Sequence, residues 1–322
     1  MINALRAESR RLLSRRIVVI SLIALLGLIA LFQLQVNSLI APPSAAQVAS
    51  AQQDYDEYLK DWEENHEQWE ADCVDSGGTA EECAMPRPTL ADWGLAPSPF
   101  DEAVTPAISF GVFLGGMLLF IAMASFIGAE ASTGSLANWL TFQPNRTTVM
   151  VSKLIVVAVF SVLTGAAVGV LTVAASSLIA AIHGQPLTGF DSIAATAARG
   201  IIVLAIFGVV GYAVGLLTSS TGASIGVLLG GFFLTYVLAI LTFTSRWAQF
   251  LAPFSPGMNL VAILEGGTTY EVSSGPSTPL TPEGEGYVTK TLSLAHGLGY
   301  WAVLLAALLV ITWSVFRRRD VT

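Results

Sequence analysis

Charged residues are scarce in this sequence. They make up 12% of its 322 residues, whereas hydrophobic residues make up 53% and the mean hydropathy is +0.66. A soluble globular domain carries about 25% charged residues, roughly twice this share. The deficit excludes a soluble globular protein and indicates a chain that lies largely in a lipid bilayer.

Catalytic residue types are also few. The three histidines are His66, His183 and His296, and none lies at the centre of an apolar run. An intramembrane hydrolase would need a nucleophile and a base buried together at membrane depth. No lysine follows a glycine, so the nucleotide-binding Walker A loop is missing as well. We therefore predict that the chain is not an enzyme and that energy for any work comes from another chain.

The centres of the apolar runs also lack ionisable residues, since Glu130 and Arg199 lie at run ends. A charge at the centre of a membrane-spanning helix costs about 2.5–3.5 kcal/mol and generally marks a path for ions or protons. Its absence argues against a carrier driven by an ion gradient.

Only two cysteines are present, Cys73 and Cys83, and both fall in the acidic segment 41–105. An isolated pair in an oxidising compartment favours a disulfide over a metal site. We predict a disulfide and no metal site, because the acidic residues around His66 are better explained as a solvated helix face.

Six runs are long and apolar enough to cross a bilayer, which takes about 20 helical residues. They are residues 17–40, 106–128, 154–182, 200–217, 222–243 and 297–316. The fold class predicted is therefore an all-α polytopic membrane protein with six transmembrane helices.

The distribution of charge predicts how these spans are oriented. Residues 1–16 hold five arginines and one glutamate, and residues 317–322 hold three arginines and one aspartate. Residues 41–105 instead hold fifteen acidic residues against two basic ones. Because basic residues stay on the cytoplasmic side, both termini should be cytoplasmic and residues 41–105 extracellular. The same alternation places 129–153 and 218–221 inside, and 183–199 and 244–296 outside.

Residues 1–16 have an amphipathic pattern, with Leu5, Ser9 and Leu12 opposite Arg6 and Arg10. This pattern predicts a helix lying in the cytoplasmic membrane interface. A cleaved signal peptide is the alternative, but the apolar run that follows is too long for one.

The two large extracellular segments differ in character. Residues 45–72 read as a helix with Val48, Tyr55, Trp62 and Trp69 seven apart, a stripe that would pack against the returning segment 85–99 or a neighbouring subunit. Residues 250–264 are too apolar for an ordinary loop and too interrupted by proline for a span, so we predict a re-entrant or interfacial segment. Residues 265–286, rich in Gly, Ser, Thr and Pro, predict a flexible surface loop.

Glycines four residues apart recur in the spans, in the rows 111/115, 165/169, 211/215 and 222/226/230. Such rows let helices approach closely in lipid. For each row we expect packing within the chain, with a dimer interface as the alternative.

The segment between the second and third spans is polar but patterned. Leu136, Trp139 and Leu140 recur at i, i+3 and i+4, on one face of a short helix. Ser132 or Thr133 would cap its start, and Pro144 would end it. A short amphipathic helix held between two spans suits the docking of a soluble partner, and a self-packing interfacial turn is the alternative.

Together these features resemble the permease subunit of bacterial type-2 ABC exporters. The resemblance is architectural over nearly the whole chain, and the motif from Gly128 to Lys153 resembles the stretch joining the second and third spans of that family. There it implies a coupling helix that docks on the ATP-binding subunit. The residues implied in that contact are Glu130, Gly134, Ser135, Leu136, Asn138, Trp139, Leu140, Phe142, Pro144 and Arg146. One departure is that residues 41–105 are longer than a minimal permease of this family requires.

The resemblance implies two cytoplasmic ATP-binding subunits, a second permease copy or paralogue, and a bacterial plasma membrane as the location. ATP and Mg would be bound by the partner subunit, and this chain would hold no cofactor and bind no nucleic acid. The substrate would be hydrophobic or amphipathic: a drug, lipid, peptide or antibiotic. The alternative function is a membrane-anchored binding or adaptor protein that acts through its extracellular loop.

Overall fold

The computed structural model describes residues 2–93, 95–135, 141, 145–244, 250–273 and 287–318. Six of the described helices are long and apolar enough to cross a membrane, so the chain is a multi-pass membrane protein. They are α2 (Arg16–Ile40), α4 (Phe100–Ser132), α6 (Arg146–Ile182), α7 (Phe190–Thr218), α8 (Thr221–Thr244) and α11 (Leu294–Arg318).

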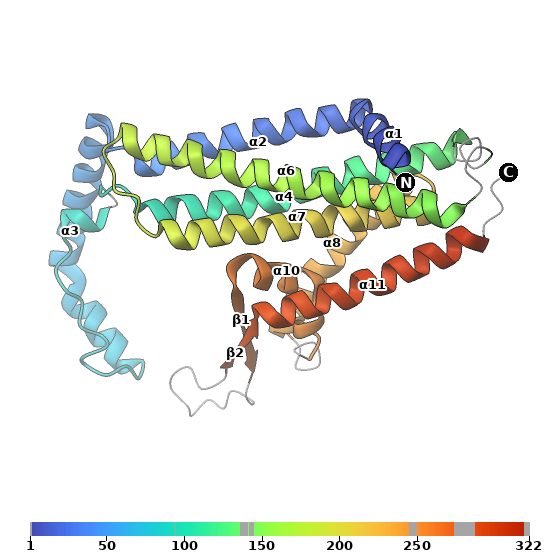
Figure 1. Ribbon diagram of the computed structural model, residues 1–322. Helices are drawn as coiled ribbons and strands as arrows, with labels where there is room; N and C mark the ends of the chain where they lie inside the picture. Colours follow the sequence, from blue (N-terminus) through green and yellow to red (C-terminus); the bar gives the residue numbers. More distant parts are fainter. Residues whose placement is uncertain are drawn as a thin grey trace.

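The remaining elements flank these helices (Figure 1). Helix α1 (Ile2–Leu13) precedes α2, and α3 (Ala45–Asp75) projects from the opposite end of the bundle. Between α8 and α11 come η2 (Ala252–Phe254), α10 (Pro256–Glu265) and the strands β1 (Gly267–Ser273) and β2 (Tyr287–Ser293). A short turn, η1 (Leu90–Trp93), lies in the segment that leads from α3 to α4.

Most of these helices are longer than the spans predicted from hydropathy. The segment 183–199, predicted as a loop, is already helical from Phe190, and the segment 129–153 is helical again from Arg146. Hydropathy detects only the apolar part of a helix, whereas the backbone continues its hydrogen bonding into polar residues. The 37 residues of α6 reach about 55 Å at 1.5 Å per residue, well beyond a bilayer core of about 30 Å.

The core lies where α4 and α7 pack along their length, and this is the most extensive helix contact among the described residues. Two small positions on α7 make it possible. A Cβ on Gly211 would collide with the Phe120 carbonyl oxygen, and one on Gly215 would come within 2.7 Å of the Ala124 carbonyl oxygen. The predicted close approach of the 211/215 row therefore occurs within this chain.

The row on α8 behaves differently, and the expectation of packing within the chain is wrong there. A Cβ on Gly226 or Gly230 would meet no atom of the described residues within 4 Å. Phe233, three residues after Gly230 on the same face of α8, is 67% exposed. Glycine spacing alone predicts that another helix can pack closely against this one, but it does not identify that helix.

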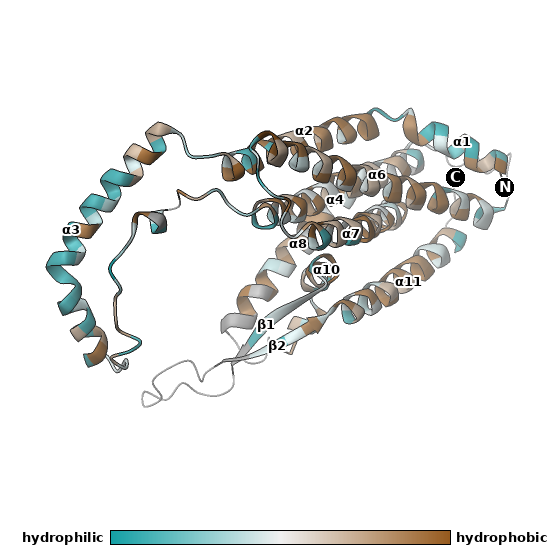
Figure 2. Cartoon of the chain, turned by 60° about the vertical axis from the view of Figure 1, so that its left-hand side comes forward, coloured by the Kyte–Doolittle hydropathy of each residue, from teal (hydrophilic) through white to brown (hydrophobic). Residues whose placement is uncertain are grey.

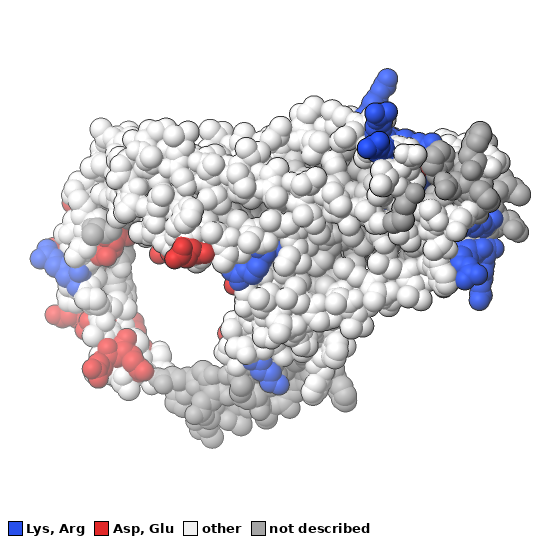
Figure 3. All heavy atoms as spheres, in the orientation of Figure 1, with Lys and Arg blue, Asp and Glu red and all other residues white. Residues whose placement is uncertain are grey.

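Helix α3 carries the acidic residues away from the bundle. Ser44 caps it by accepting a hydrogen bond from the Gln47 backbone N–H, while the Gln47 side chain accepts one from the Ser44 backbone N–H. Figure 2 shows that this helix is mostly hydrophilic, whereas the long helices are hydrophobic. Figure 3 shows acidic side chains over α3 and basic ones near α1 and the C-terminal end of α11.

The segment that returns from α3 is tied back to it. The Cys73 and Cys83 sulfurs are bonded at 2.05 Å, and the Trp93 ring packs on Tyr55 and Tyr58. Near the same turn, the backbone N–H and the hydroxyl of Thr89 donate to the Asp92 carboxylate and lower its pKa. The returning segment is thus one partner of the predicted aromatic stripe.

The prediction of a flexible loop over 265–286 is wrong for its first part, and the fold is not purely helical. Strand β1 pairs antiparallel with β2, from Gly267 opposite Ser293 to Ser273 opposite Tyr287. Both strands are rich in Thr, Tyr and Val, which favour extended backbone. The glycines, serines and prolines that suggested a loop lie mostly in 274–286, outside the described residues.

The segment predicted as re-entrant forms α10, whose Ile263 and Leu264 are fully buried between α7 and α11. The Asn259 side chain donates to the Pro253 and Ser255 carbonyl oxygens and holds the preceding turn. Its re-entry into the bilayer stays a prediction.

We expect Gly215→Leu to lower the free energy of unfolding by about 3 kcal/mol, because the added side chain meets the α4 backbone rather than a movable side chain. The measurement is the thermal unfolding midpoint of the purified protein in detergent. Gly27→Leu is the matched control, since a Cβ at Gly27 meets nothing within 4 Å. Equal midpoints for the two variants would contradict this account of the α4–α7 contact.

Candidate functional site

The candidate site is the end of the bundle that carries α1, where the polar segment between α4 and α6 begins and ends. Helix α4 ends at Ser132, and Gly134 takes a left-handed conformation with φ +69°, which suits glycine. Helix α6 then begins at Arg146, with the Asn145 side chain accepting a hydrogen bond from the Thr148 backbone N–H at 3.1 Å.

The expectation that Ser132 or Thr133 caps the next helix stays a prediction, because that helix lies mostly outside the described residues. Both hydroxyls donate back to the Ala129 carbonyl oxygen, at 3.2 and 2.8 Å. They therefore belong to the end of α4, because α4 continues four residues beyond the predicted end of its span.

Most residues predicted to bind the ATPase fall outside the described part of the chain. These are Leu136, Asn138, Trp139, Leu140, Phe142 and Pro144. Of the others, Gly134 is half-buried and Ser135 is exposed, with its hydroxyl 3.3 Å from the Glu130 carbonyl oxygen. Their contact with a partner stays a prediction.

Glu130 and Arg146 flank this segment, and each makes contacts within the chain. Glu130 is only 4% exposed and contacts Lys153 and Arg15. Arg146 donates to the carbonyl oxygens of Phe316 and Arg317, at 3.2 and 3.4 Å, where a cation stabilises the C-terminal end of α11. The two residues therefore hold the ends of the segment in place. Their contact with a partner stays a prediction.

A buried ion cluster, made of Glu8, Arg15, Glu130 and Lys153, joins three helices here. The Lys153 ammonium lies 2.5 Å from a Glu8 carboxylate oxygen and 2.6 Å from a Glu130 carboxylate oxygen. Arg15 reaches the other Glu130 oxygen at 3.3 Å. Glu8 comes from α1, Glu130 from α4 and Lys153 from α6, so the cluster ties α1 to both flanks of the polar segment.

The centre of the cluster is shielded from solvent, whereas the Arg15 side chain at its edge is 34% exposed. Glu8 is 0% exposed and Lys153 is 1% exposed, and the Phe126 ring lies 4.8 Å from the Lys153 nitrogen. Removing an ion from water costs several kcal/mol, which is offset only where opposite charges and hydrogen bonds are well placed. Two carboxylates matched by an ammonium and a guanidinium meet that condition. The cluster is therefore stable as a unit and sensitive to the loss of any member.

Sequence reasoning missed this cluster. In the sequence, Lys153 is only the last residue of the motif that begins at Gly128, and Glu8 is one acid among five arginines. One signal was present: Glu8 falls with Leu5 and Leu12 on the apolar face of α1, where an unpaired acid would be costly. Its partners are 122 and 145 residues away, and no local pattern identifies them.

A second feature is an apolar cavity of about 550 Å³ between α4, α7, α8, α10 and α11. Aromatic rings dominate its lining, from Phe110, Phe113, Phe120, Phe207, Phe232 and Trp301. Trp301 is 7% exposed, and its indole N–H has no hydrogen-bond partner among the described residues. The cavity suits an apolar, partly aromatic molecule.

We expect Lys153→Met to lower the free energy of unfolding by about 3–5 kcal/mol, because Glu8 and Glu130 lose the cation between them while staying buried. The thermal unfolding midpoint in detergent measures this loss. The control is the triple variant Glu8→Gln, Glu130→Gln, Lys153→Met, which buries no unpaired charge and should recover most of the loss. A single variant as stable as the unmodified protein would refute the role given to the cluster.

Comparison with known families gives one match, to the model described as ABC-2 family transporter protein, over residues 6–321. The matched range runs from α1 to beyond α11 and so includes every element of the site. No curated protein and no solved structure matches the chain.

Proposed function

The chain belongs to the ABC-2 family of transporter proteins and is a membrane transport component, and from this premise we propose a more specific role. It is the permease of an ATP-driven exporter, and a separate cytoplasmic subunit binds ATP and Mg and hydrolyses the nucleotide. That subunit docks on residues 134–144, between α4 and α6. The substrate is hydrophobic or amphipathic.

The observation that carries this proposal is the buried ion cluster. It connects Glu130, five residues before Ser135, with Lys153, near the start of α6, and connects both with Glu8 on α1. A partner that pushes on residues 134–144 would therefore move α1, α4 and α6 together rather than bend one loop. Rigid coupling of this kind is what a transporter needs to convert closure of an ATPase into helix movement.

The aromatic cavity supports the substrate class. Its lining is apolar apart from a few groups, so a hydrated ion or sugar would lose its hydrogen bonds on entering. A hydrophobic or amphipathic molecule would gain contact with the rings. Drugs, lipids, peptides and antibiotics all include molecules of this description.

The open glycine row on α8 supports a second permease copy. A Cβ on Gly226 or Gly230 would meet no described atom within 4 Å, and the exposed ring of Phe233 lies beside them on the same helix face. In lipid, a row of small residues is a preferred place for another helix to pack closely. We propose that a second copy or a paralogue covers this face, so that two permeases meet two ATP-binding subunits.

The proposed location is a bacterial plasma membrane with both termini in the cytoplasm. In the structure the arginine-rich α1 and the Arg317 end of α11 lie at the same end, opposite the acidic α3 (Figures 1 and 3). This arrangement matches the bias of basic residues toward the cytoplasmic side.

The alternative role, a membrane-anchored binding or adaptor protein, draws on α3 and its disulfide. Helix α3 extends 31 residues and contacts mainly the segment that follows it. This projecting element could receive an extracellular partner, in addition to or in place of transport.

We expect the double variant Trp139→Asp, Leu140→Asp to abolish co-purification with the partner ATPase, because two charges replace the predicted apolar docking face. Insertion into the membrane should be unchanged, since the substitutions lie outside the spans. The matched control is Leu90→Asp, Trp93→Asp, which makes the same chemical change on the opposite side of the membrane. Unchanged association, together with loss of function on deletion of residues 45–95, would favour the adaptor role.

We expect Gly226→Leu, Gly230→Leu to shift the purified permease from dimer to monomer, because the leucines keep a second helix from approaching α8. Mass photometry in detergent would measure the change. Gly299→Leu on α11 is the control, as its Cβ also meets nothing within 4 Å. A dimer that persists in the α8 variant would place the interface elsewhere.

A further inference from the structure

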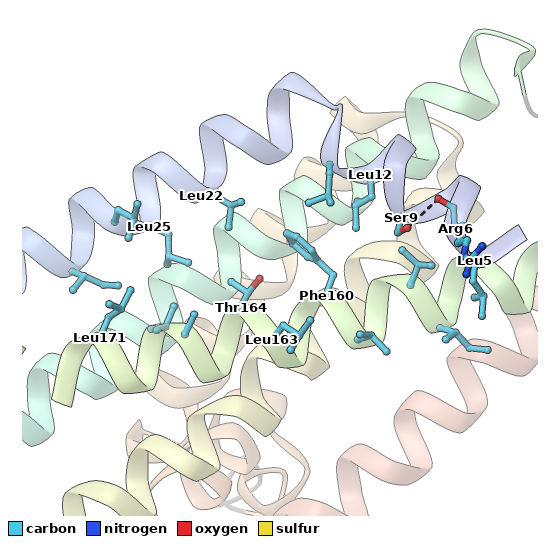
Figure 4. A pocket seen from close by; sticks show the side chains of 18 residues that line it. Leu5, Arg6, Ser9, Leu12, Leu22, Leu25, Phe160, Leu163, Thr164 and Leu171 are labelled. Carbon is cyan, nitrogen blue, oxygen red and sulfur yellow. Dashed lines mark hydrogen bonds between the residues drawn. The ribbon is translucent and has the colours of Figure 1, made fainter. Parts of the chain in front are cut away.

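A long apolar groove runs along the outside of the bundle between α1, α2 and α6, with a volume of about 710 Å³ (Figure 4). Leu22 and Leu25 of α2 form one wall, and Phe160 and Leu163 of α6 form the other. Helix α1 closes one end of the groove, with Leu5 and Leu12 turned toward it.

The groove is open to the surrounding lipid. Leu163 and Val159 on its α6 wall are 62% and 53% exposed, and Leu26 on its α2 side is 55% exposed. Along α6 the lining runs from Ile155 to Leu171, about 24 Å at 1.5 Å per residue. One leaflet contributes about half of a hydrocarbon core that is about 30 Å thick. The groove is therefore long enough to hold an acyl chain of the leaflet on the α1 side.

The polar groups are concentrated at the α1 end. Arg6 and Ser9 line the groove there, and the other polar lining residue, Thr164, lies farther along α6. Arg6 is exposed, and no ion pair involves it among the described residues. Arg10 lies one turn farther along α1, on the same side as Arg6. The mouth of the groove therefore offers the Arg6 guanidinium to an anion, and the exposed Arg10 lies next to it on α1.

We propose that this groove binds one anionic phospholipid of the leaflet that α1 faces. An acyl chain lies between α2 and α6, and the phosphate accepts hydrogen bonds from Arg6 and Arg10. A basic segment at the membrane surface attracts anionic headgroups, and the guanidinium group binds phosphate with two parallel hydrogen bonds. The apolar walls and the basic mouth thus match the two parts of one molecule.

The bound lipid would act on α1, which carries Glu8 of the buried ion cluster. Leu12 faces the groove and Glu8, one turn earlier, faces Lys153. A lipid that holds α1 against α2 and α6 therefore also holds the contact between α1 and the polar segment. Lipid composition would regulate the permease at this point, while the binding itself requires neither ATP nor the ATPase.

Native mass spectrometry of the purified full-length chain tests the proposal, with dioleoyl phosphatidylglycerol and dioleoyl phosphatidylcholine as probes of equal acyl chains. We expect the phosphatidylglycerol adduct to persist at roughly tenfold lower lipid concentration than the phosphatidylcholine adduct, as two interfacial arginines would give at least this preference. Arg6→Glu should remove the preference, and Arg6→Lys should keep most of it. Arg318→Glu is the matched charge control, because it makes the same change of charge at the C-terminal end of α11, outside the groove.

Ala167→Phe tests the groove itself, since this exposed position on its α6 wall can take a ring that fills the space. It should abolish the phosphatidylglycerol adduct, whereas Val170→Phe, on a lipid-facing position outside the groove, should not. Equal retention of the two lipids would overturn the anionic headgroup site. Adducts unchanged in Ala167→Phe would overturn the groove as the place of binding. Neither result depends on ATP-driven export, because no ATPase is present in the experiment.

Discussion

The contact on which the rest of the arrangement depends is the burial of the Lys153 ammonium between the carboxylates of Glu8 and Glu130. Among the described residues it is the one place where α1, α4 and α6 meet through charge, and it lies near the ends of the polar segment between α4 and α6. Buried charges of this kind contribute little net stability compared with apolar packing, but they penalise every arrangement in which they are separated. The cluster therefore specifies how α1 sits against the two helices, and so how the polar segment between them is held.

The helices fall into a tightly packed set and a loosely packed set. Helices α4 and α7 pack through glycines whose replacement would meet the backbone of the opposite helix, whereas α8 keeps its glycines open and its phenylalanines exposed. A membrane protein gains nothing from hiding apolar surface that lipid solvates equally well, so exposure alone carries no meaning there. Open small residues do carry meaning, because they leave room for another backbone. The tightly packed helices α4 and α7 suit the transmission of force. The loosely packed α8 suits assembly with a second copy and the movement of an apolar substrate.

Helix α1 has three surfaces with three partners. Glu8 faces the ion cluster, Leu5 and Leu12 face the groove along α2 and α6, and Arg6 lies at the mouth of that groove with the exposed Arg10 next to it. This division explains why a single glutamate occurs among five arginines in the first sixteen residues. The same short helix can therefore respond both to the lipid around it and to the segment that a cytoplasmic partner would contact.

The sequence by itself determined the properties that depend on local composition. Apolar runs predicted six spans, the charge of the loops predicted that both basic ends lie together, and the motif from Gly128 to Lys153 predicted the family that the comparison identifies. Only the tertiary structure decided which charges meet, since Glu8, Glu130 and Lys153 are far apart in sequence and each has a plausible exposed role in isolation. It also decided that 267–273 and 287–293 pair as strands, and that the 226/230 glycines stay uncovered while the 211/215 glycines do not. The physical reason is the same throughout: partition between water and lipid is a property of each segment, whereas pairing and packing are properties of two segments together.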